Sequence, residues 1–443
     1  MPTLTQPEKI TIRTYNVGFG DCFFLKFHYP DFERNILVDF GTTKRPPGSS
    51  KNWKKKIAQD IQNHCNGKLH AVIVTHRHSD HISGFQTSKN GHGSGDIIAG
   101  CQPDIVILPW TEHPQAQTDA IEPPAVLMQG GAALRKPYSI KFSSMQAYMK
   151  YAVSLARSAD KQNGAPILGA TQSERDKQWE EIEAVGTTNL KNLNAIKNLS
   201  TMSHQNKHFY VHFNSESGLE DLLPGVTTHV LGPPTLKQSE GTTLTQRSAD
   251  PTEFWQLQAR AEQVVRDKGY RLFKDAETIT GEDPVDMRWF KSQFNDSYRQ
   301  QLIEFVRDVD QAINNTSLIL LFECGNEKLL FPGDAQIENW QYALNKDDVK
   351  ELLKGVTFYK VGHHGSTNAT PKSLWKLLEN KKSVTGTKNT LNTINSTLGH
   401  HHSNVPRKSL VESLNNESSY FSTEMLEEGT LYQDTIIHIE DGS

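Results

Sequence analysis

Short runs of apolar and β-branched residues, bounded by Gly, Pro, Asn and Ser, recur along both ends of the chain. Such runs of four to eight residues are typical of β-strands. The expected strands are 10–17, 22–29, 35–40, 69–74, 104–109, 209–213, 228–231, 317–324, 328–331, 356–361 and 435–439. The first three should form a hairpin or meander, and Gly325-Asn326 predicts a hairpin between 317–324 and 328–331.

Helices are expected between these strands. Apolar residues at Trp53, Ile57 and Ile61 have the period of a helix and predict one at 53–64. The middle of the chain is polar and helix-like, with further helices expected at 144–157, 173–185, 251–268 and 289–309. Strands in both halves with helices between them predict a layered α/β protein. The expected divisions are a first half at 1–140, a helical insertion or loop region at 141–207, core strands at 208–234, a helical insertion at 235–310 and a second half at 311–443.

Composition narrows this picture only slightly. The chain has 47 basic and 51 acidic residues and a net charge of −4, which does not by itself indicate nucleic-acid binding but leaves a local basic groove open. The four cysteines are scattered, with no close pair in the sequence. Three lie within or beside apolar runs and are expected to be free buried thiols, and we expect neither a disulfide framework nor a cysteine zinc site. The N-terminus lacks an apolar signal region and no apolar run reaches membrane-spanning length, so we expect a cytoplasmic protein.

The segment Thr75 to Gly84 carries the most informative pattern in the chain. His76, His78, Asp80 and His81 directly follow the apolar run Ala71-Val72-Ile73-Val74. Imidazole and carboxylate ligands together suit zinc and neighbouring metals. A solvated polar loop is the alternative, but such loops rarely place three histidines and an aspartate at this spacing after four β-formers.

Two later segments repeat the same local arrangement. Asp334 follows a strand and the turn Pro332-Gly333, while His363 and His364 follow the strand 356–361. Either segment alone is weak, because Gly-Asp turns are common and a His-His pair is more often at the surface. Together with the first array they predict that several strand ends meet at one metal centre, since rigid elements are where metal ligands need to sit.

These motifs resemble the metallo-β-lactamase-fold hydrolases, and within them the soluble domain of competence-type (ComEC) DNA-uptake proteins. The matching segments are Asn16 to Cys22, Ile36 to Gly41, Thr75 to Gly84, Val230 to Pro234, Asn314 to Ile319, Pro332 to Ala335 and Lys360 to Ser366. The resemblance covers about 1–110 and 208–443, without a counterpart for 111–207 or the insertion 235–310. It implies a four-layer αββα metallo-β-lactamase sandwich with two adjacent Zn²⁺ ions, or Mn²⁺ in their place.

The resemblance also implies roles for single residues. His76 and His78 would bind the first metal, Asp80 and His81 the second, and Asp334 would bridge both. His363 is preferred over His364 as the remaining ligand because it comes first after the strand. His364 would then support a ligand or hold a substrate phosphate, so Asp80 and His364 are the predicted catalytic residues.

Other residues are given supporting roles. Asp21 and Asp39 are expected to brace the ligand loops by hydrogen bonds, with a simple turn as the alternative for Asp39. Lys360, Ser366 and Thr367, with His364, are expected to form a polar rim suited to anions.

The sequence departs from the family at several positions. Asn16 and His78 stand where the competence-type branch usually has aspartate. The additional histidine that many two-zinc members supply to the first metal has no clear counterpart. His113 is a candidate for it, and an ordinary loop residue is the alternative. His400 to His402 are either a surface loop or contacts to a substrate phosphate or metal.

The implied function is a metal-dependent phosphodiesterase or nuclease that uses a metal-activated hydroxide on a phosphodiester substrate, a nucleic acid or nucleotide. One alternative keeps the fold but changes the bond to a lactone, thioester or β-lactam. Another is a non-catalytic metal-binding module whose insertion binds a partner protein. No membrane association is expected.

Overall fold

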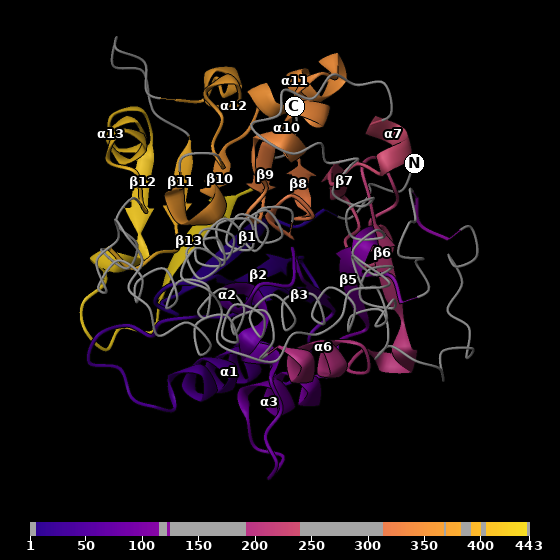
Figure 1. The fold of residues 1–443 in the computed structure, drawn as a ribbon, viewed down its shortest axis with the longest axis vertical. Helices are drawn as coiled ribbons and strands as arrows, with labels where there is room; N and C mark the ends of the chain where they lie inside the picture. The colour runs from indigo at the N-terminus through magenta and orange to yellow at the C-terminus, as the bar shows by residue number, and fades with distance from the viewer. Residues whose placement is uncertain are drawn as a thin grey trace, which may run out of the picture.

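A computed structural model describes residues 6–114, 122–124, 192–239, 313–366, 369–381, 391–399 and 405–440. Two mixed β-sheets form its centre (Figure 1). The first sheet has the strand order β13-β1-β2-β3-β4-β5-β6 and the second β12-β11-β10-β9-β8-β7. The α/β class predicted from the sequence is confirmed.

The first sheet is antiparallel at one end and parallel at the other. Strands β13, β1, β2 and β3 pair antiparallel, and β3 to β6 pair parallel. The bounds are β1 Lys9–Tyr15, β2 Cys22–His28, β3 Glu33–Phe40, β4 Ala71–Ile73, β5 Ile105–Pro109, β6 His208–Val211 and β13 Tyr432–His438. The predicted meander of the first three strands is confirmed.

The second sheet joins an antiparallel hairpin to a parallel set. Strands β7, β8 and β9 pair antiparallel, whereas β9 to β12 pair parallel. The bounds are β7 Thr227–Gly232, β8 Ile319–Cys324, β9 Glu327–Phe331, β10 Phe358–Lys360, β11 Asn392–Asn395 and β12 Ser419–Ser422. The β8–β9 hairpin confirms the prediction from Gly325-Asn326.

Apolar side chains from both sheets form one core between them. Phe23 of β2 packs against Phe331 of β9 with ring centroids 5.8 Å apart, and Phe358 of β10 joins the same cluster. A second core lies under helices α1 (Trp53–His64), α3 (Ser94–Gly100) and α6 (Leu193–Leu199) on the outer face of the first sheet.

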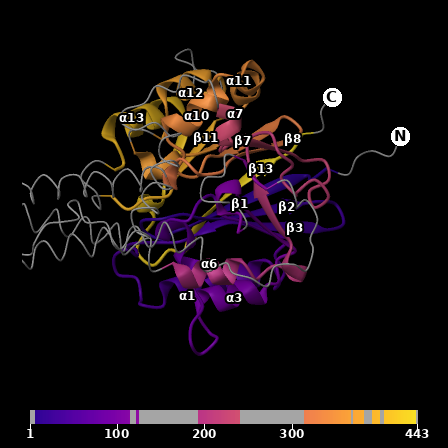
Figure 2. The same ribbon diagram turned by 45° about the vertical axis from the view of Figure 1, so that its right-hand side comes forward.

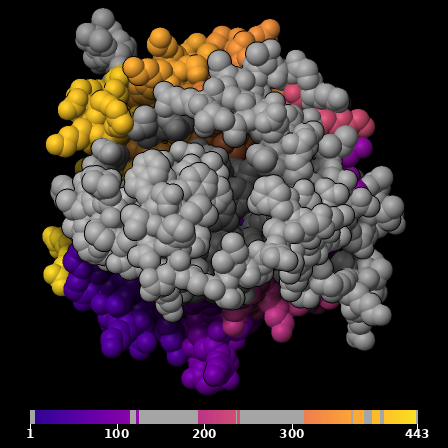
Figure 3. All heavy atoms as spheres, viewed as in Figure 1, coloured from indigo at the N-terminus to yellow at the C-terminus, as the bar shows by residue number. Residues whose placement is uncertain are grey.

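A third core lies on the outer face of the second sheet. It is covered by α10 (Ile337–Leu344), α11 (Asp347–Lys354), α12 (Lys372–Leu377) and α13 (Lys408–Glu417). Seen from the side, the helices therefore lie outside the two sheets, one group on each face (Figure 2). In the space-filling view the N-terminal helices lie at the bottom and the C-terminal elements at the top (Figure 3).

All the predicted strands are present, with ends shifted by a few residues, and α1 begins and ends where the period predicts. The strands β11 and β12 were not predicted from the sequence. Nor were the helices α3, α6 and α10 to α13, and these helices have six to ten residues each. Such short helices repeat their apolar period too few times to be recognised. The helices expected at 144–157, 173–185, 251–268 and 289–309 lie outside the described residues. Among the residues that the structure describes, none belongs to a helix with the length and apolar character needed to cross a membrane.

Candidate metal centre

The carboxyl ends of β4, β9 and β10 bring the predicted site residues together. The histidine array follows β4 and continues into the short helix α2 (Ser79–Ile82). Asp334 follows β9, and His363 and His364 follow β10. Since β4 belongs to the first sheet and the other two strands to the second, the candidate centre lies where the two sheets meet.

A glycine permits this close approach. Gly333 has a φ of +55°, which favours glycine, and a Cβ there would lie 2.7 Å from Cβ of Thr75. The segment before β8 is joined to the same array through the backbone, because the Leu318 amide donates to the Thr75 carbonyl at 2.9 Å. A side chain at position 333 would therefore push the Asp334 turn away from the histidine array.

Four buried side chains form the compact part of the centre. Asp80, His81, Asp334 and His364 each place one potential ligand atom within 4.8 Å of the others. His81 Nε2 lies 3.1 Å from Asp334 Oδ2, and His364 Nε2 lies 3.1 Å from Asp80 Oδ2. The spatial convergence predicted from residues almost 300 positions apart is thus observed.

His76 and His78 extend this group on one side. His76 Nε2 lies 3.9 Å from Asp334 Oδ2 and 3.0 Å from His78 Nδ1. Both imidazoles are buried. His76 thus approaches the same Asp334 oxygen as His81, and His78 is joined to the group through His76.

His363 and His364 reach Asp334 from one turn. Each Nε2 lies 3.8 Å from Asp334 Oδ2. Only His364 also contacts Asp80, and its side chain is fully buried, whereas the His363 side chain is 27% exposed and its Nδ1 lies 3.0 Å from Ser366 Oγ. Both residues have positive φ, +43° and +53°, which is uncommon for residues other than glycine. His364 thus belongs to the compact group and His363 lies at its edge, and both stay candidates for the last ligand.

The buried charges of the centre compensate one another. Burial opposes ionisation of Asp334, but the adjacent His81, His363 and His364 hold the pKa of its carboxyl well below the ordinary range. Burial would lower the pKa of His81 and of His364, but the neighbouring carboxylates, Asp334 first among them, raise both. Burial beside His81 and His78 lowers the pKa of His76 well below its ordinary value.

The donor set fits a metal ion. Both carboxylate oxygens of Asp334 and Nε2 of His81 are buried, and among the described residues no hydrogen bond of normal geometry satisfies them. Buried polar atoms are rarely left without a partner, and a coordinated ion is one explanation when they are. Imidazole nitrogens with carboxylate oxygens are ligands of Zn²⁺ and its neighbours.

Asp39 braces the histidine array, as expected. Its carboxylate accepts hydrogen bonds from the Thr75 amide at 2.8 Å and the Thr75 hydroxyl at 2.7 Å. His81 Nδ1 lies 2.8 Å from Asp39 Oδ2, which directs His81 Nε2 toward Asp334. Asp39 also has a φ of +54° and lies within β3, opposite the register shift between Cys22 and Phe23 of β2, so it forms a β-bulge and not a turn.

Lys360 is placed differently from the prediction. Its side chain is 2% exposed, forms an ion pair with Asp21 and donates to the Gly333 carbonyl at 3.1 Å. The Nζ atom also lies 3.6 Å from Asp334 Oδ1. The expectation that Lys360 belongs to a polar rim suited to anions is therefore wrong. Its ammonium group is buried, where it offsets the charge of the Asp21 and Asp334 carboxylates. A lysine within the apolar run 358–361 was the signal in the sequence.

Ser396 also contributes without having been predicted. His364 Nδ1 lies 2.7 Å from the Ser396 carbonyl, and the Ser396 hydroxyl donates to the Gly20 carbonyl at 2.6 Å. Asp21 lies 3.7 Å from His81 and 3.6 Å from His364, so it supports both rings electrostatically. Nothing in the polar segment around Ser396 distinguishes it from an ordinary strand end.

The remaining predicted residues lie at the margin or outside. Asn16 donates to the Thr430 carbonyl and lies in no ligand group among the described residues. His113 is buried with its ring 4.7 Å from that of Tyr210. Two groups of potential ligands are found in the described part of the chain, the compact one and Asp21 with Asp39 and His81, and His113 belongs to neither. Thr367 and His400 to His402 are outside the described residues.

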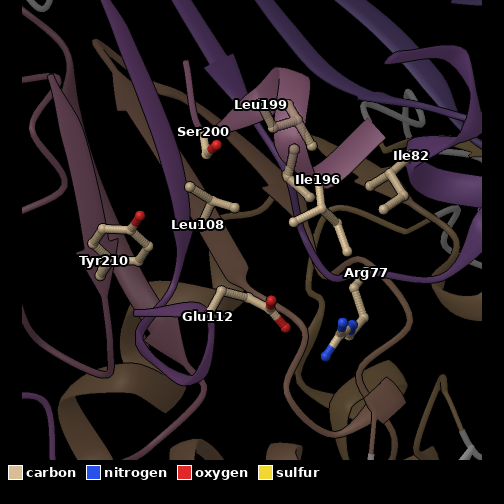
Figure 4. A pocket seen from close by; sticks show the side chains of 9 residues that line it. Arg77, Ile82, Leu108, Glu112, Ile196, Leu199, Ser200 and Tyr210 are labelled. Atoms are coloured by element: carbon tan, nitrogen blue, oxygen red, sulfur yellow. The ribbon is translucent and has the colours of Figure 1, made fainter. Parts of the chain in front are cut away.

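A pocket adjoins the array on the side of the first sheet (Figure 4). Arg77 and Glu112 extend toward it, and apolar side chains such as Leu108 and Ile196 line the rest. Burial raises the pKa of the Glu112 carboxyl, against the opposing charges of Arg77 and His78. In the sequence Arg77 lies between the predicted ligands His76 and His78, but its side chain lines this pocket and is not part of the compact metal group.

Comparisons with known proteins do not assign the chain to a family. No family model matches the chain. No curated protein matches it either. What the fold and the site define is an α/β protein with a buried histidine and aspartate group that could hold a metal ion.

Proposed function

We propose that this chain is a metal-dependent hydrolase with the four-layer αββα sandwich of the metallo-β-lactamase fold, acting on phosphodiester bonds. The observation that carries the proposal is the buried convergence of Asp80, His81, Asp334 and His364 from three strand ends. Two facing mixed sheets with helices on their outer faces support the fold assignment.

The residues divide naturally between two metal positions. His76 and His78 would serve one position and Asp80 with His81 the other, with Asp334 between them. His364 or His363 would complete the second position. When bound, a Zn²⁺ pair lowers the pKa of a coordinated water and polarises the oxygen of the bond to be cleaved.

The protein's own groups have separate tasks in this scheme. Asp80 is held by its contact with His364 and can orient the attacking water. Asp39 fixes the tautomer and direction of His81, as carboxylate partners of metal-binding histidines do. Lys360 offsets the charge of Asp21 and Asp334 from inside.

The choice of a phosphodiester bond rests on the competence-type resemblance and on the exposed edge of the centre. Ser366 and the partly exposed His363 lie there, and both can donate hydrogen bonds to an anionic oxygen. With Lys360 buried, no lysine among the described site residues adds to this edge. Binding of the substrate is therefore expected to depend more on the metals than on a basic groove.

Hydrolysis tests the proposal directly. Purified protein loaded with Zn²⁺ or Mn²⁺ is compared on bis-p-nitrophenyl phosphate, a chromogenic cephalosporin and a lactone. We expect phosphodiester hydrolysis whose rate falls about 100-fold or more in Asp334→Asn and in Asp80→Ala. The first variant loses the proposed ligand shared by both metals, and the second loses the group that orients the attacking water. The exposed Asp347→Asn on α11 is the matched control and should keep full activity. Turnover of the lactone or cephalosporin alone would move the proposal to carbonyl substrates, and inertness on all three would leave only a metal-binding module.

Metal content tests the site apart from its activity. Plasma mass spectrometry of Zn²⁺-loaded and dialysed protein is expected to give about two metal ions per chain, falling in Asp334→Asn. His363→Ala and His364→Ala decide which imidazole is the ligand, because only the true ligand should lower the metal content. Wild-type protein that retains no metal would contradict the proposal.

A further inference from the structure

Two cysteines far apart in the sequence meet at the ends of two helices. Cys65 is the residue after α1, and Cys101 is the residue after α3. Their Sγ atoms lie 4.0 Å apart, although 36 positions separate them in the chain. All four cysteines are described, and neither Cys22 nor Cys324 has another sulfur within hydrogen-bond distance. The expectation of free buried thiols is confirmed, but nothing in the sequence indicated that Cys65 and Cys101 lie side by side.

From this geometry we propose that Cys65 and Cys101 form a redox-reactive dithiol, which a peroxide oxidises to a disulfide that joins α1 to α3. A disulfide needs the sulfurs about 2 Å apart. Each sulfur therefore has to move by only about 1 Å, which side-chain rotation can supply. The helices α1 and α3 already pack against each other in the core beneath the first sheet.

The pair lies just beneath the surface. Both side chains are buried, but Asn66 and Gly67 after Cys65 and Gln102 after Cys101 are exposed. A small opening of these helix ends would admit a molecule as small as hydrogen peroxide. Cys324, at the end of β8, also precedes exposed residues, but neither it nor Cys22 at the start of β2 pairs with a second sulfur among the described residues.

The two thiols are also unequal. The hydrogen bond with Cys101 and the backbone amides of Gly67 and Lys68 lower the pKa of Cys65 despite its burial. The same hydrogen bond, together with burial, raises the pKa of Cys101. Because the thiolate is the nucleophile, Cys65 is expected to react first and Cys101 to resolve the product.

The chemistry balances with peroxide as the only co-reactant. The Cys65 thiolate attacks one peroxide oxygen, the O–O bond breaks, and sulfenic acid and hydroxide form. Cys101 loses its proton to the hydroxide and attacks the Cys65 sulfur, and the second hydroxide leaves and is protonated to water. In total two thiols and one H₂O₂ give one disulfide and two waters.

The crosslink would enclose a functionally relevant part of the chain. The 36-residue span from Cys65 to Cys101 includes β4 and the array from His76 to His81. A disulfide of this span restricts the unfolded chain and so stabilises the folded one. This part of the inference is independent of what the metal centre does.

Peptide mapping of the full-length protein tests the proposal. Protein is treated with a small excess of hydrogen peroxide, denatured, alkylated with iodoacetamide and digested with trypsin without reduction. We expect a linked pair of peptides containing Cys65 and Cys101, two alkylated cysteines at 22 and 324, and reversal by dithiothreitol. Four alkylated cysteines, or over-oxidised Cys65 without a link, would overturn it.

Two variants and a melting curve complete the test. Cys101→Ser is expected to leave a sulfenic acid on Cys65 that dimedone traps, whereas Cys324→Ser should keep the crosslink. Oxidised wild type should melt about 5 °C higher than reduced protein. Equal melting temperatures in the presence of the crosslink would contradict the stapling of α1 to α3. The wild-type mapping decides the main question even if Cys101→Ser does not fold.

Discussion

At the scale of single residues, the centre depends on a relay from Thr75 through Asp39 to His81. The Thr75 amide and hydroxyl hold the Asp39 carboxylate, and that carboxylate holds the imidazole that faces Asp334. The side chains of the relay and of Asp334 are all buried, so water cannot replace a lost hydrogen-bond partner. Thr75 itself touches no predicted substrate position, and its role is to position His81.

Thr75→Val tests this relay, because valine keeps the shape but loses the hydroxyl. We expect the free energy of unfolding to fall by about 1–3 kcal/mol, since Asp39 loses a hydrogen bond to a charged group. The affinity for Zn²⁺ should fall about 10- to 100-fold by competition with a chromogenic chelator. Thr393→Val in β11 is the control, because that buried hydroxyl pairs with Ser418 Oγ. A loss of stability in both variants with unchanged Zn²⁺ affinity in Thr75→Val would contradict the relay.

At the scale of the elements, charged pairs join neighbouring strands where the sheet becomes exposed. Glu323 of β8 lies between a histidine and a lysine, with Oε2 2.8 Å from His229 Nε2 on β7 and Oε1 3.0 Å from Lys328 Nζ on β9. Burial works against ionisation, but these two contacts lower the pKa of Glu323 below its ordinary value of 4.5. Glu323 is about one-third exposed, so solvent weakens the effect.

The sign of this shift gives a pH prediction. A carboxyl whose pKa is lower in the folded state stabilises it above pH 4.5, and this contribution is lost as the pH falls through the lowered pKa. Glu323→Gln should therefore cost less than about 1 kcal/mol at pH 7 and nothing at a pH below the lowered pKa. Urea unfolding at both pH values measures it, with Glu327→Gln on β9 as the control. A cost that persists undiminished in acid would show that packing, not charge, is responsible.

At the scale of the whole molecule, the inter-sheet core holds the three ligand-bearing strand ends together. Phe331 ends β9, three residues before Asp334, and its ring lies among those of Phe23, Phe322 and Phe358. The ring is 1% exposed. The position of Asp334 relative to the first sheet therefore depends on apolar packing, not only on the turn that follows β9.

Phe331→Ala is predicted to weaken both the fold and the centre. The free energy of unfolding should fall by about 3–5 kcal/mol because a large buried side chain leaves a cavity. The metal content of the folded fraction should fall as well. Phe421→Ala in β12, whose side chain is only partly buried against the same core, should cost clearly less. Urea unfolding measures both variants. Equal losses of unfolding free energy would show that Phe331 contributes no more to the inter-sheet core than Phe421 does.

The sequence was most informative where local pattern and chemistry coincide. The strands from 9 to 109 were recognised because their apolar residues lie in short runs with clear turns between them. The array at His76 to His81 was recognised because four residues of metal-binding type follow one buried strand. Short elements such as α12 and β11 were missed, because six and four residues carry too little period to stand out.

What the sequence alone determined is the set of metal-suited residues and their place at strand ends, since both follow from the order of residue types along the chain. Only the tertiary structure decided that Lys360 lies inside among the carboxylates, that His364 joins the compact group and that Cys65 meets Cys101. These are distances between residues up to 339 positions apart, as for Lys360 and Asp21. Packing of the two sheets and their helices sets such distances, and local residue pattern carries no record of them.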